Sequence, residues 1–381
     1  MTPSSTELLS PADFRDLFPA LDRWAWFDTP GSPPAAAPVA MALRGALADW
    51  ERGDFAWRDW DAAVDAARDA FARFAGVGSE RVAVLGSVAE GMSTIARALP
   101  PGSVVVGDCE YRSMLYPLLA LDQRRNPVIR VPSVDGAVTE DGLLSALRDD
   151  TVLVAVSDTL TSTGRRVDLQ RLRTVTAERG VRVAADLTQS LGVLAHDLSS
   201  LGLDYVLVHG YKWLLCPRGA AWLIVPEDRP ADLAPLLPSW KSTDPPYGYF
   251  GGDLELPPTA SRLDTSPAWF SWIGAVAALG LRERLDPQDV ERHCVGLASR
   301  FASEVADIGI ASVVAASDSH IAVVELGDSA GRVGRGLEAA GVKATLLGSR
   351  LRIGVHYFNN HDDIDRLVAA VRDATTRRRS R

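Results

Sequence analysis

An acid and a lysine at the ends of two apolar stretches are the residues of this sequence that point most directly to chemistry. The apolar stretch 205–210 runs into Lys212, and a second apolar stretch, 220–225, follows. Asp186 ends the preceding apolar stretch, 26 residues before Lys212. A lysine in this place is either a solvated turn residue or an amine held for reaction, and the acid either caps a helix or holds a protonated ring nitrogen. In an open parallel sheet both would reach one crevice, because ligands bind beyond the carboxyl ends of the strands.

The elements that must position these residues alternate between short apolar strands and amphipathic helices. Strands are predicted at 81–86, 103–108, 127–133, 151–158, 181–186, 205–210 and 220–225, and helices at 35–52, 61–76, 87–99, 110–125, 140–149 and 168–180. This alternation predicts an α/β fold with a mainly parallel sheet covered by helices on both faces. Further polar residues follow the strands, namely Ser87, Glu110, Tyr111, Asp158, Thr161, Gln189, His209 and Tyr211.

The rhythm changes after residue 268, which predicts a second domain. Helices are predicted at 269–285, 287–309, 330–341 and 361–374, with strands at 320–326 and 350–355. We therefore expect a large domain over 1–268 and a smaller C-terminal α+β domain over 269–381. The first 30 residues are expected to pack near the small domain or the active site.

Composition excludes several classes of protein. The 381 residues are 47% apolar and 23% charged, as in ordinary globular proteins, and the net charge of -9 argues against a nucleic-acid binder. The basic end, 377–381, is read as a solvated tail. Cys109, Cys216 and Cys294 have no metal-binding spacing, so we expect no metal and reduced thiols in the cytoplasm. No signal peptide and no membrane-spanning stretch are predicted.

Several ordered segments resemble one known family. They are 26–34 ("WFDTPGSPP"), 86–99 ("GSVAEGMSTIARAL"), 110–117 ("EYRSMLYP"), 184–192 ("AADLTQSLG"), 204–225 ("DYVLVHGYKWLLCPRGAAWLIV"), 262–275 ("RLDTSPAWFSWIGA") and 350–367 ("RLRIGVHYFNNHDDIDRL"). Together they resemble the class V aminotransferases, which are pyridoxal-phosphate (PLP) enzymes of fold type I and include cysteine desulfurases, kynureninases and isopenicillin-N-epimerase-like enzymes. The resemblance covers nearly the whole chain. It implies the PLP-dependent transferase fold, PLP as cofactor, and a homodimer with active sites at the subunit interface.

The resemblance also implies roles for residues around the cofactor ring. Lys212 would form the Schiff base with PLP, and Asp186 would keep the pyridine nitrogen protonated, so that the ring can accept electrons. Tyr111 would stack on the ring. Gln189 would hydrogen-bond the ring hydroxyl, and Thr161 stands where the family often has Asn.

Other roles concern the phosphate and the substrate. The backbone of Val88 and Ala89 at a helix N-terminus would bind the phosphate. His209 and Tyr211 stand where the family has phosphate ligands. Further assignments are Thr265 and Ser266 for the neighbouring subunit's phosphate, Arg352 for the substrate α-carboxylate, Thr29 in the N-terminal substrate-side loop, and Trp57 and Arg58 with the segment 239–252 for the rest of the substrate pocket.

The assignments have plainer alternatives, and the sequence departs from the family in places. Tyr111 can be a core aromatic, Arg352 a structural ion-pair residue, and His209 a packing residue beneath the turn. The family's phosphate-loop Thr is replaced by Val88 or Ala89, its Ser by His209 and its His by Tyr211, so we expect the phosphate contacts to be rebuilt from different donors. The stretch 338–354 lacks the cysteine that desulfurases carry there, so persulfide transfer is not expected.

The expected activity is that of a PLP-dependent enzyme acting at the α-amino group and Cα of a small amino acid. We expect aminotransferase-like chemistry, since the sequence shows no acid dedicated to a leaving group. The alternative is a β-eliminating lyase, of the C–S type, or an epimerase-like enzyme. A non-catalytic binding module of the same fold is a hypothesis of a different class, and the presence of both Lys212 and Asp186 argues against it.

Overall fold

The computed structural model describes residues 7–243, 249–314 and 318–376, and its largest sheet has seven strands. The strands are β2 (Val82–Leu85), β3 (Ser103–Gly107), β4 (Val128–Val131), β5 (Thr151–Ser157), β6 (Arg182–Asp186), β7 (Tyr205–His209) and β8 (Ala221–Ile224). Their order is β2-β8-β7-β6-β5-β3-β4, and β3 to β7 pair in parallel. Only β8 runs antiparallel to its neighbours β7 and β2. The predicted mainly parallel α/β sheet is therefore confirmed.

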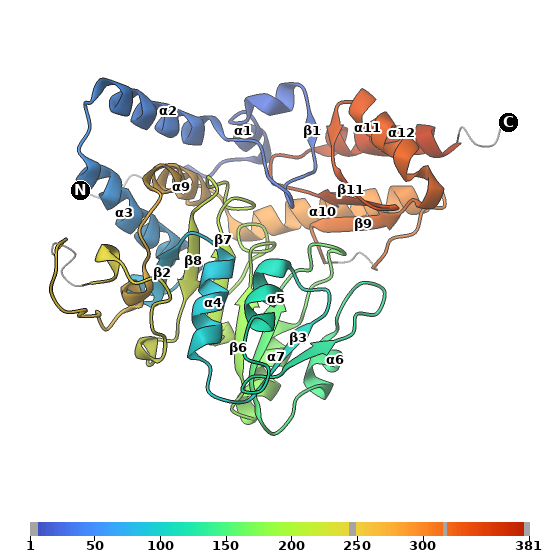
Figure 1. Cartoon of the computed structure of the whole chain (residues 1–381). Helices are drawn as coiled ribbons and strands as arrows, with labels where there is room; N and C mark the ends of the chain where they lie inside the picture. Colours follow the sequence, from blue (N-terminus) through green and yellow to red (C-terminus); the bar gives the residue numbers. More distant parts are fainter. Residues whose placement is uncertain (1–6, 244–248, 315–317, 377–381) are drawn as a thin grey trace.

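Helices cover both faces of this sheet. They are α2 (Ala37–Arg52), α3 (Trp57–Ala75), α4 (Val88–Ala98), α5 (Arg112–Leu119), α6 (Glu140–Ser145), α7 (Leu169–Glu178), α8 (Leu198–Leu201) and α9 (Trp269–Arg282). Side chains alternate between two cores, as strand geometry requires: Val104 and Val106 pack with α4 and α5, whereas Val105 belongs to the core that contains α3, α7 and α9. Figure 1 shows α4 and α5 in front of the sheet.

The C-terminal elements form a smaller layer above the large sheet in Figure 1. They are α10 (Pro287–Ala306), β9 (Ile321–Glu325), α11 (Ala330–Ala339), β10 (Val342–Lys343), β11 (Thr345–Leu347), β12 (Arg350–Gly354) and α12 (His361–Thr376). The strands β11, β12 and β9 make an antiparallel sheet. Because α9 packs against α2 and α3, a domain boundary at 268/269 stays a prediction.

The N-terminal segment joins the C-terminal elements. It contains α1 (Pro11–Arg15) and β1 (Ala25–Trp26), and β1 pairs in parallel with β10. Asp28 forms an isolated bridge with Gly354, at the end of β12. This pairing brings residues 28–30 beside the strand that carries Arg352.

Local signals set the ends of the elements. The side chain of Ser87 accepts a hydrogen bond from the backbone of Glu90 and so caps α4. Gly53 and Gly76 end α2 and α3 with φ values of 74° and 67°. The predicted helix 110–125 covers only 112–119 in the structure, where Pro117 offers no backbone N–H. Short 3-10 helices lie at η1 (Pro19–Asp22), η2 (Ser79–Arg81), η3 (Pro230–Asp232), η4 (Trp240–Ser242), η5 (Ala260–Leu263) and η6 (Gly327–Ser329).

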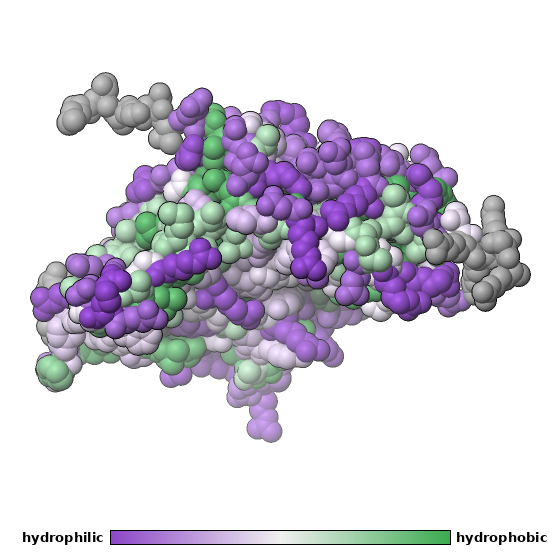
Figure 2. Space-filling view, turned by 90° about the horizontal axis from the view of Figure 1, so that it is seen from above, coloured by the Kyte–Doolittle hydropathy of each residue, from purple (hydrophilic) through white to green (hydrophobic). Residues whose placement is uncertain are grey.

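Large hydrophobic side chains lie exposed around α2 and in the segment 249–254. They are Met41, Leu47, Trp50, Phe55, Tyr249, Phe250 and Leu254. Figure 2 shows hydrophobic residues most densely on the half of the molecule that carries α2 and α3 in Figure 1. Among the described helices, none combines the length and apolar character needed to cross a membrane.

Candidate active site

A pocket lies at the carboxyl ends of β3, β5, β6 and β7, and it encloses about 490 Å³ including the solvent at its mouth. Its lining contains eight of the residues predicted from the sequence, namely Val88, Tyr111, Thr161, Asp186, Gln189, His209, Tyr211 and Lys212. The remaining lining residues are Cys109, Ser113, Ser157, Thr159, Leu160 and Thr188. Its position is that expected for a ligand site in an open α/β sheet.

Lys212 is the unpaired cation of this pocket. It stands in the connection between β7 and β8 and is 5% exposed, and its side-chain amine has no hydrogen bond or ion pair with the described residues. Its ammonium lies 5.4 Å from the ring centre of Tyr111. Burial lowers the pKa of Lys212 to about 8, with Asp186 opposing and Arg352 contributing to the decrease. A lysine with a pKa near 8 becomes a mainly neutral, nucleophilic amine above that pH, more than two pH units below an ordinary lysine.

A glycine makes the sharp turn before Lys212 possible. A Cβ on Gly210 would lie 2.7 Å from the ring of Trp222 and 2.9 Å from the sulfur of Cys216. The backbone N–H of Gly210 donates to the carbonyl of Ala220, and its own carbonyl accepts from Cys216. These two hydrogen bonds close the connection that leaves β7, turns through Lys212 and enters β8.

Asp186 is the buried acid that ends β6. It is 6% exposed, and its Oδ1 accepts a hydrogen bond of 2.8 Å from the backbone of Thr188. Burial raises the pKa of Asp186, while the contacts with Thr188 and the charge of Lys212 lower it. No helix follows Asp186 directly, so it is not a helix N-cap. Its carboxylate is available to a ligand in the pocket.

Two aromatic residues of the pocket differ in their surroundings. Tyr111, at the start of α5, is 47% exposed, which does not fit a core aromatic. His209 is buried against the ring of Tyr211, and its Nε2 has no hydrogen-bond partner. Burial lowers the pKa of His209 to about 4, and the charges of Arg218 and Lys212 add to the effect. His209 is therefore neutral at physiological pH.

Arg352, on β12, connects the C-terminal elements to the pocket. Its Nη1 donates to Thr161 Oγ1 at 2.9 Å, and its Nη2 lies 3.4 Å from Asp28 Oδ1. Its Nε is buried and has no partner. A purely structural ion pair would satisfy that atom, so one edge of the guanidinium stays available to a carboxylate.

The N-terminus of α4 also faces this region through Val88. The Ser87 hydroxyl accepts a hydrogen bond from the N–H of Glu90, and the Glu90 carboxylate accepts one from the N–H of Gly86. In the described structure the N–H groups of Val88 and Ala89 have no acceptor. Free N–H groups at a helix start are suited to an anion such as a phosphate.

Thr29, Trp57 and Arg58 are not brought into the lining of this pocket. Thr29 is fully buried beside Asp28, with its hydroxyl unpartnered. Trp57 packs among aromatic rings, 5.9 Å from Trp269 and 6.1 Å from Trp240 between ring centres, and Arg58 lies over its face. Residues 244–248 of the predicted substrate segment, and the basic end 377–381, lie outside the described residues.

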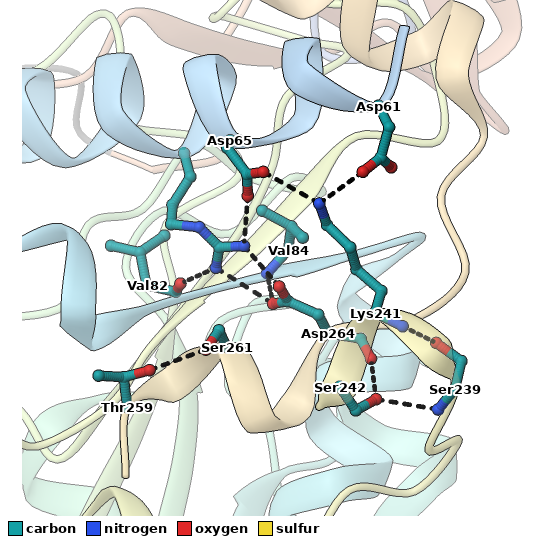
Figure 3. Close-up of polar contacts among 11 residues, drawn as sticks. Asp61, Asp65, Val82, Val84, Ser239, Lys241, Ser242, Thr259, Ser261 and Asp264 are labelled. Carbon is teal, nitrogen blue, oxygen red and sulfur yellow. Dashed lines mark hydrogen bonds and ion pairs between the residues drawn. The ribbon is translucent and has the colours of Figure 1, made fainter. Parts of the chain in front are cut away.

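Thr265 and Ser266 are also outside the lining. They follow Asp264 in the chain, and Figure 3 shows the contacts of Asp264. The side chain of Asp264 is 1% exposed. Its carboxylate accepts hydrogen bonds from Arg68 Nη1 at 3.1 Å, Arg68 Nη2 at 2.5 Å and the backbone N–H of Val84 at 2.9 Å. Arg68 Nη1 also donates to the carbonyl of Val82 at 2.6 Å. The two side chains thus satisfy backbone groups on the open edge of β2, as a neighbouring strand would.

A second ion group joins this cluster. Lys241 Nζ contacts Asp61 at 2.9 Å and Asp65 at 3.0 Å, and the hydroxyl of Ser242 donates to the Asp264 carbonyl at 2.6 Å (Figure 3). These contacts tie the segments 239–243 and 260–266 to α3. Each of these buried charges has an oppositely charged partner.

Some lining residues were missed because they are ordinary residue types directly after a strand. Ser157 ends β5, Thr159 follows it and Thr188 follows β6, and only their position at or past the strand ends could have indicated them. Glu110 holds Ser157 in place, because its carboxylate accepts hydrogen bonds from the backbone N–H and the hydroxyl of Ser157. Burial raises the pKa of Glu110 to about 7.

The fold is that of known solved enzymes. The E. coli cysteine desulfurase CsdA superposes with a TM-score of 0.83 at 20% identity, over 97% of this chain and 99% of that one. A cystine C–S lyase, C-DES, in complex with cysteine persulfide superposes with a TM-score of 0.83 at 21% identity, over 93% and 99%. The structure therefore has the PLP-dependent transferase fold of type I, as the resemblance implied.

Sequence comparison defines the family. The model of the class-V aminotransferases matches residues 54–367, so the chain belongs to this family of PLP-dependent enzymes. The aminotransferase YcbU of Bacillus subtilis (strain 168), described as uncharacterized, is 23% identical over 93% of this chain and 95% of its own length. Isopenicillin N epimerase of Streptomyces clavuligerus is 24% identical over 85% and 87%. The family thus includes aminotransferase, lyase and epimerase members.

Proposed function

We propose that this enzyme transfers the amino group of a small amino acid and that Lys212 carries PLP as a Schiff base. One observation carries the proposal: within the residues that the structure describes, a buried lysine whose amine has a lowered pKa and no hydrogen bond or ion pair lines the same pocket as a buried acid. Burial of an unpaired amine lowers the free energy of unfolding, so such a residue indicates a functional site, here the attachment of a covalent cofactor.

The donors and acceptors of the pocket fit this cofactor. PLP has a basic ring nitrogen, a phenolic oxygen and a phosphate, and when bound it withdraws electrons from bonds at the substrate Cα. Asp186 offers a carboxylate to the ring nitrogen, and the half-exposed ring of Tyr111 offers a stacking surface. Gln189 and Thr161, which are hydrogen-bonded to each other at 2.7 Å in the pocket lining, would hold the ring oxygen.

For the phosphate, the unpartnered groups are the N–H donors of Val88 and Ala89 at the start of α4 and the Nε2 of His209. The hydroxyl of Tyr211 would complete this end of the pocket. These donors replace the threonine, serine and histidine side chains that the family resemblance implied. The phosphate would thus be held mainly by neutral donors and the helix terminus.

Arg352 would bind the substrate carboxylate, and Thr29 lies in the adjoining N-terminal segment. The unpartnered Nε of Arg352 gives this guanidinium an edge for a carboxylate even while Nη1 holds Thr161. The charge of Arg352 contributes to the lowered pKa of Lys212, so the two side chains are close to each other. A substrate whose carboxylate is bound by Arg352 would therefore have its Cα near the lysine amine. Lys212 is then the residue that removes or returns the proton at Cα.

We further propose a cytoplasmic homodimer that completes each site. Thr265 and Ser266 do not line the pocket of their own chain, and the aromatic group around Trp57 and Arg58 lies apart from it. The exposed hydrophobic side chains on α2 and at 249–254 form the kind of surface that a partner covers (Figure 2). Sedimentation of the protein at micromolar concentration would show a monomer if this part is wrong.

The choice between transamination and β-elimination depends on the leaving group. Cys109 lines the pocket, but burial and the charges of Glu110 and Asp108 raise the pKa of its thiol to about 11, so it is not a ready nucleophile for persulfide transfer. Among the described lining residues the only carboxylic acid is Asp186, which is assigned to the ring nitrogen, so no carboxylic acid is left for a departing β-substituent. We therefore favour transamination.

The test is a single half-reaction. The PLP-loaded enzyme is mixed with each of a panel of amino acids, without a ketoacid acceptor. Transamination predicts one equivalent of ketoacid per active site and a change of the cofactor band to that of the aminated form. Repeated turnover that releases a β-substituent, with the original band unchanged, would instead establish β-elimination, and release of the enantiomer of the added amino acid would establish epimerisation.

A further inference from the structure

The amide of Gln189 has no N–H left to donate to a ligand. Its Oε1 accepts a hydrogen bond of 2.9 Å from the indole Nε1 of Trp213, and its Nε2 donates to the carbonyl of Pro30 at 3.2 Å and to Thr161 Oγ1 at 2.7 Å. An indole N–H can only donate and a backbone carbonyl can only accept, so these two partners fix which end of the amide is oxygen. Both amide hydrogens are then in use.

The hydroxyl of Thr161 is constrained in the opposite sense. Its Oγ1 receives the Gln189 amide and, at 2.9 Å, Arg352 Nη1. Amide and guanidinium nitrogens only donate, and a hydroxyl oxygen has two acceptor positions. Both are occupied, so the remaining capacity of Thr161 is its own O–H. No acceptor for that O–H occurs among the described residues, and Thr161 lines the pocket beside Lys212 and Asp186.

We propose that Thr161, and not Gln189, gives the hydrogen bond to the phenolic oxygen of the cofactor ring, and that Trp213 and Arg352 are the positioning residues that impose this polarity. The proposal rests on the function proposed above, because it takes PLP as the ligand. Gln189 acts through Thr161. Trp213 follows Lys212 directly in the chain, so one segment supplies the reactive amine and also sets the direction of this hydrogen bond.

The role of Arg352 in this arrangement does not compete with carboxylate binding. Nη1 serves Thr161, whereas Nε is free and Nη2 has only long contacts of 3.3–3.4 Å with Thr345 and Asp28. A substrate carboxylate at the Nε–Nη2 edge leaves the Thr161 contact intact. The same guanidinium can therefore orient the donor and bind the substrate.

The experiment compares Thr161→Val, which keeps the shape and removes the hydroxyl, with Thr161→Ser, which keeps the hydroxyl. Each variant is loaded with PLP, and the visible absorbance of the bound cofactor is titrated with pH in the absence of substrate. Loss of a donor makes the ring oxygen more basic, so the midpoint of Thr161→Val should rise by about one pH unit. Thr161→Ser should stay within a few tenths of a unit of the wild type.

Trp213→Phe tests the positioning role. It keeps an aromatic ring in the core but removes the N–H that holds Gln189, so the amide can reverse, and the midpoint should rise by less than in Thr161→Val. Trp222→Phe is the matched control, because the indole nitrogen of Trp222 is buried without a partner. It should leave the midpoint unchanged.

The outcomes separate this inference from the proposed function. A wild-type protein that takes up no PLP would overturn both. A wild type that binds PLP on Lys212, with an unchanged midpoint in Thr161→Val, would overturn this inference alone. Equal shifts in Trp213→Phe and Trp222→Phe would show that Trp213 acts by packing only.

Discussion

Asp264 and Lys212 are both buried, at 1% and 5% exposed, but they differ in whether their charged groups have partners. Asp264 receives both ends of the Arg68 guanidinium and a backbone N–H, and Lys241 nearby has two carboxylates. The amine of Lys212 has no hydrogen bond or ion pair in the described structure, and His209 and Arg352 each keep an unpartnered nitrogen.

The difference separates a structural charge cluster from a functional one. Buried polar groups that are fully paired hold a structure together, whereas unpaired ones cost free energy and persist where a ligand completes them. Chemical type alone would not distinguish the two regions, since both contain a lysine, an arginine and aspartates. The two regions differ in whether each charged group has a hydrogen-bond or ion-pair partner, and the following substitutions test that difference.

The largest effect is expected for Asp264→Ala. It leaves Arg68 without its main counter-charge and Val84 N without an acceptor, so the free energy of unfolding should fall by about 3–5 kcal/mol. Denaturant unfolding measures this. Asp65→Ala is the control, since the Asp65 side chain is 56% exposed and its removal should cost less than about 1 kcal/mol. Equal effects of the two substitutions would contradict the structural role of Asp264.

A smaller effect, on activity and not on stability, is expected for Arg352→Ala. Loss of a charged hydrogen-bond pair to the substrate carboxylate is worth about 1.5–3 kcal/mol, so kcat/KM should fall roughly 10- to 150-fold while PLP stays bound. Arg350→Ala, on the same strand but paired with Glu325 at the surface, is the control. An unchanged kcat/KM in Arg352→Ala would remove Arg352 from the site.

The smallest effect has the opposite sign to that of Asp264→Ala. Without cofactor, Lys212→Met should raise the free energy of unfolding at pH 7 by about 1–3 kcal/mol, because each unit of the lowered pKa costs about 1.4 kcal/mol. The pKa of Lys212 is about 8 when folded and 10.5 ordinarily, so the unfolded chain binds the extra proton between these values. The cost is full below pH 8 and fades as the pH rises toward 10.5.

Lys241→Met provides the contrast for that measurement. Lys241 is buried with two carboxylates, so its replacement should lower the stability where Lys212→Met raises it. A stabilising Lys241→Met, or a destabilising Lys212→Met in the cofactor-free protein, would show that the two regions do not differ as described.

Much of the fold follows from local patterns. The seven strands of the large sheet and the helices between them, except the four-residue α8, were predicted because apolar runs and caps are local signals. The pairing of β1 with β10 was not, since two-residue strands separated by more than 300 residues leave no periodicity to read. The same holds for the side-chain pair that covers the edge of β2.

The site divides in the same way. Lys212, Asp186 and Thr161 could be placed because they follow strands whose ends meet at one edge of the sheet. In the sequence, Trp213 is one more residue of an apolar stretch. Only the structure shows that its indole N–H donates a hydrogen bond to Gln189. Hydrogen-bond direction depends on three-dimensional partners, which the sequence does not reveal.

The most direct test of the central claim is the site of covalent attachment. The chain contains only three lysines, Lys212, Lys241 and Lys343. The protein is loaded with PLP, reduced with borohydride, digested and mapped by mass spectrometry. One label per chain on Lys212 is the expected result. A label on Lys241 or Lys343 in its place, or a protein that retains no label, would contradict the account.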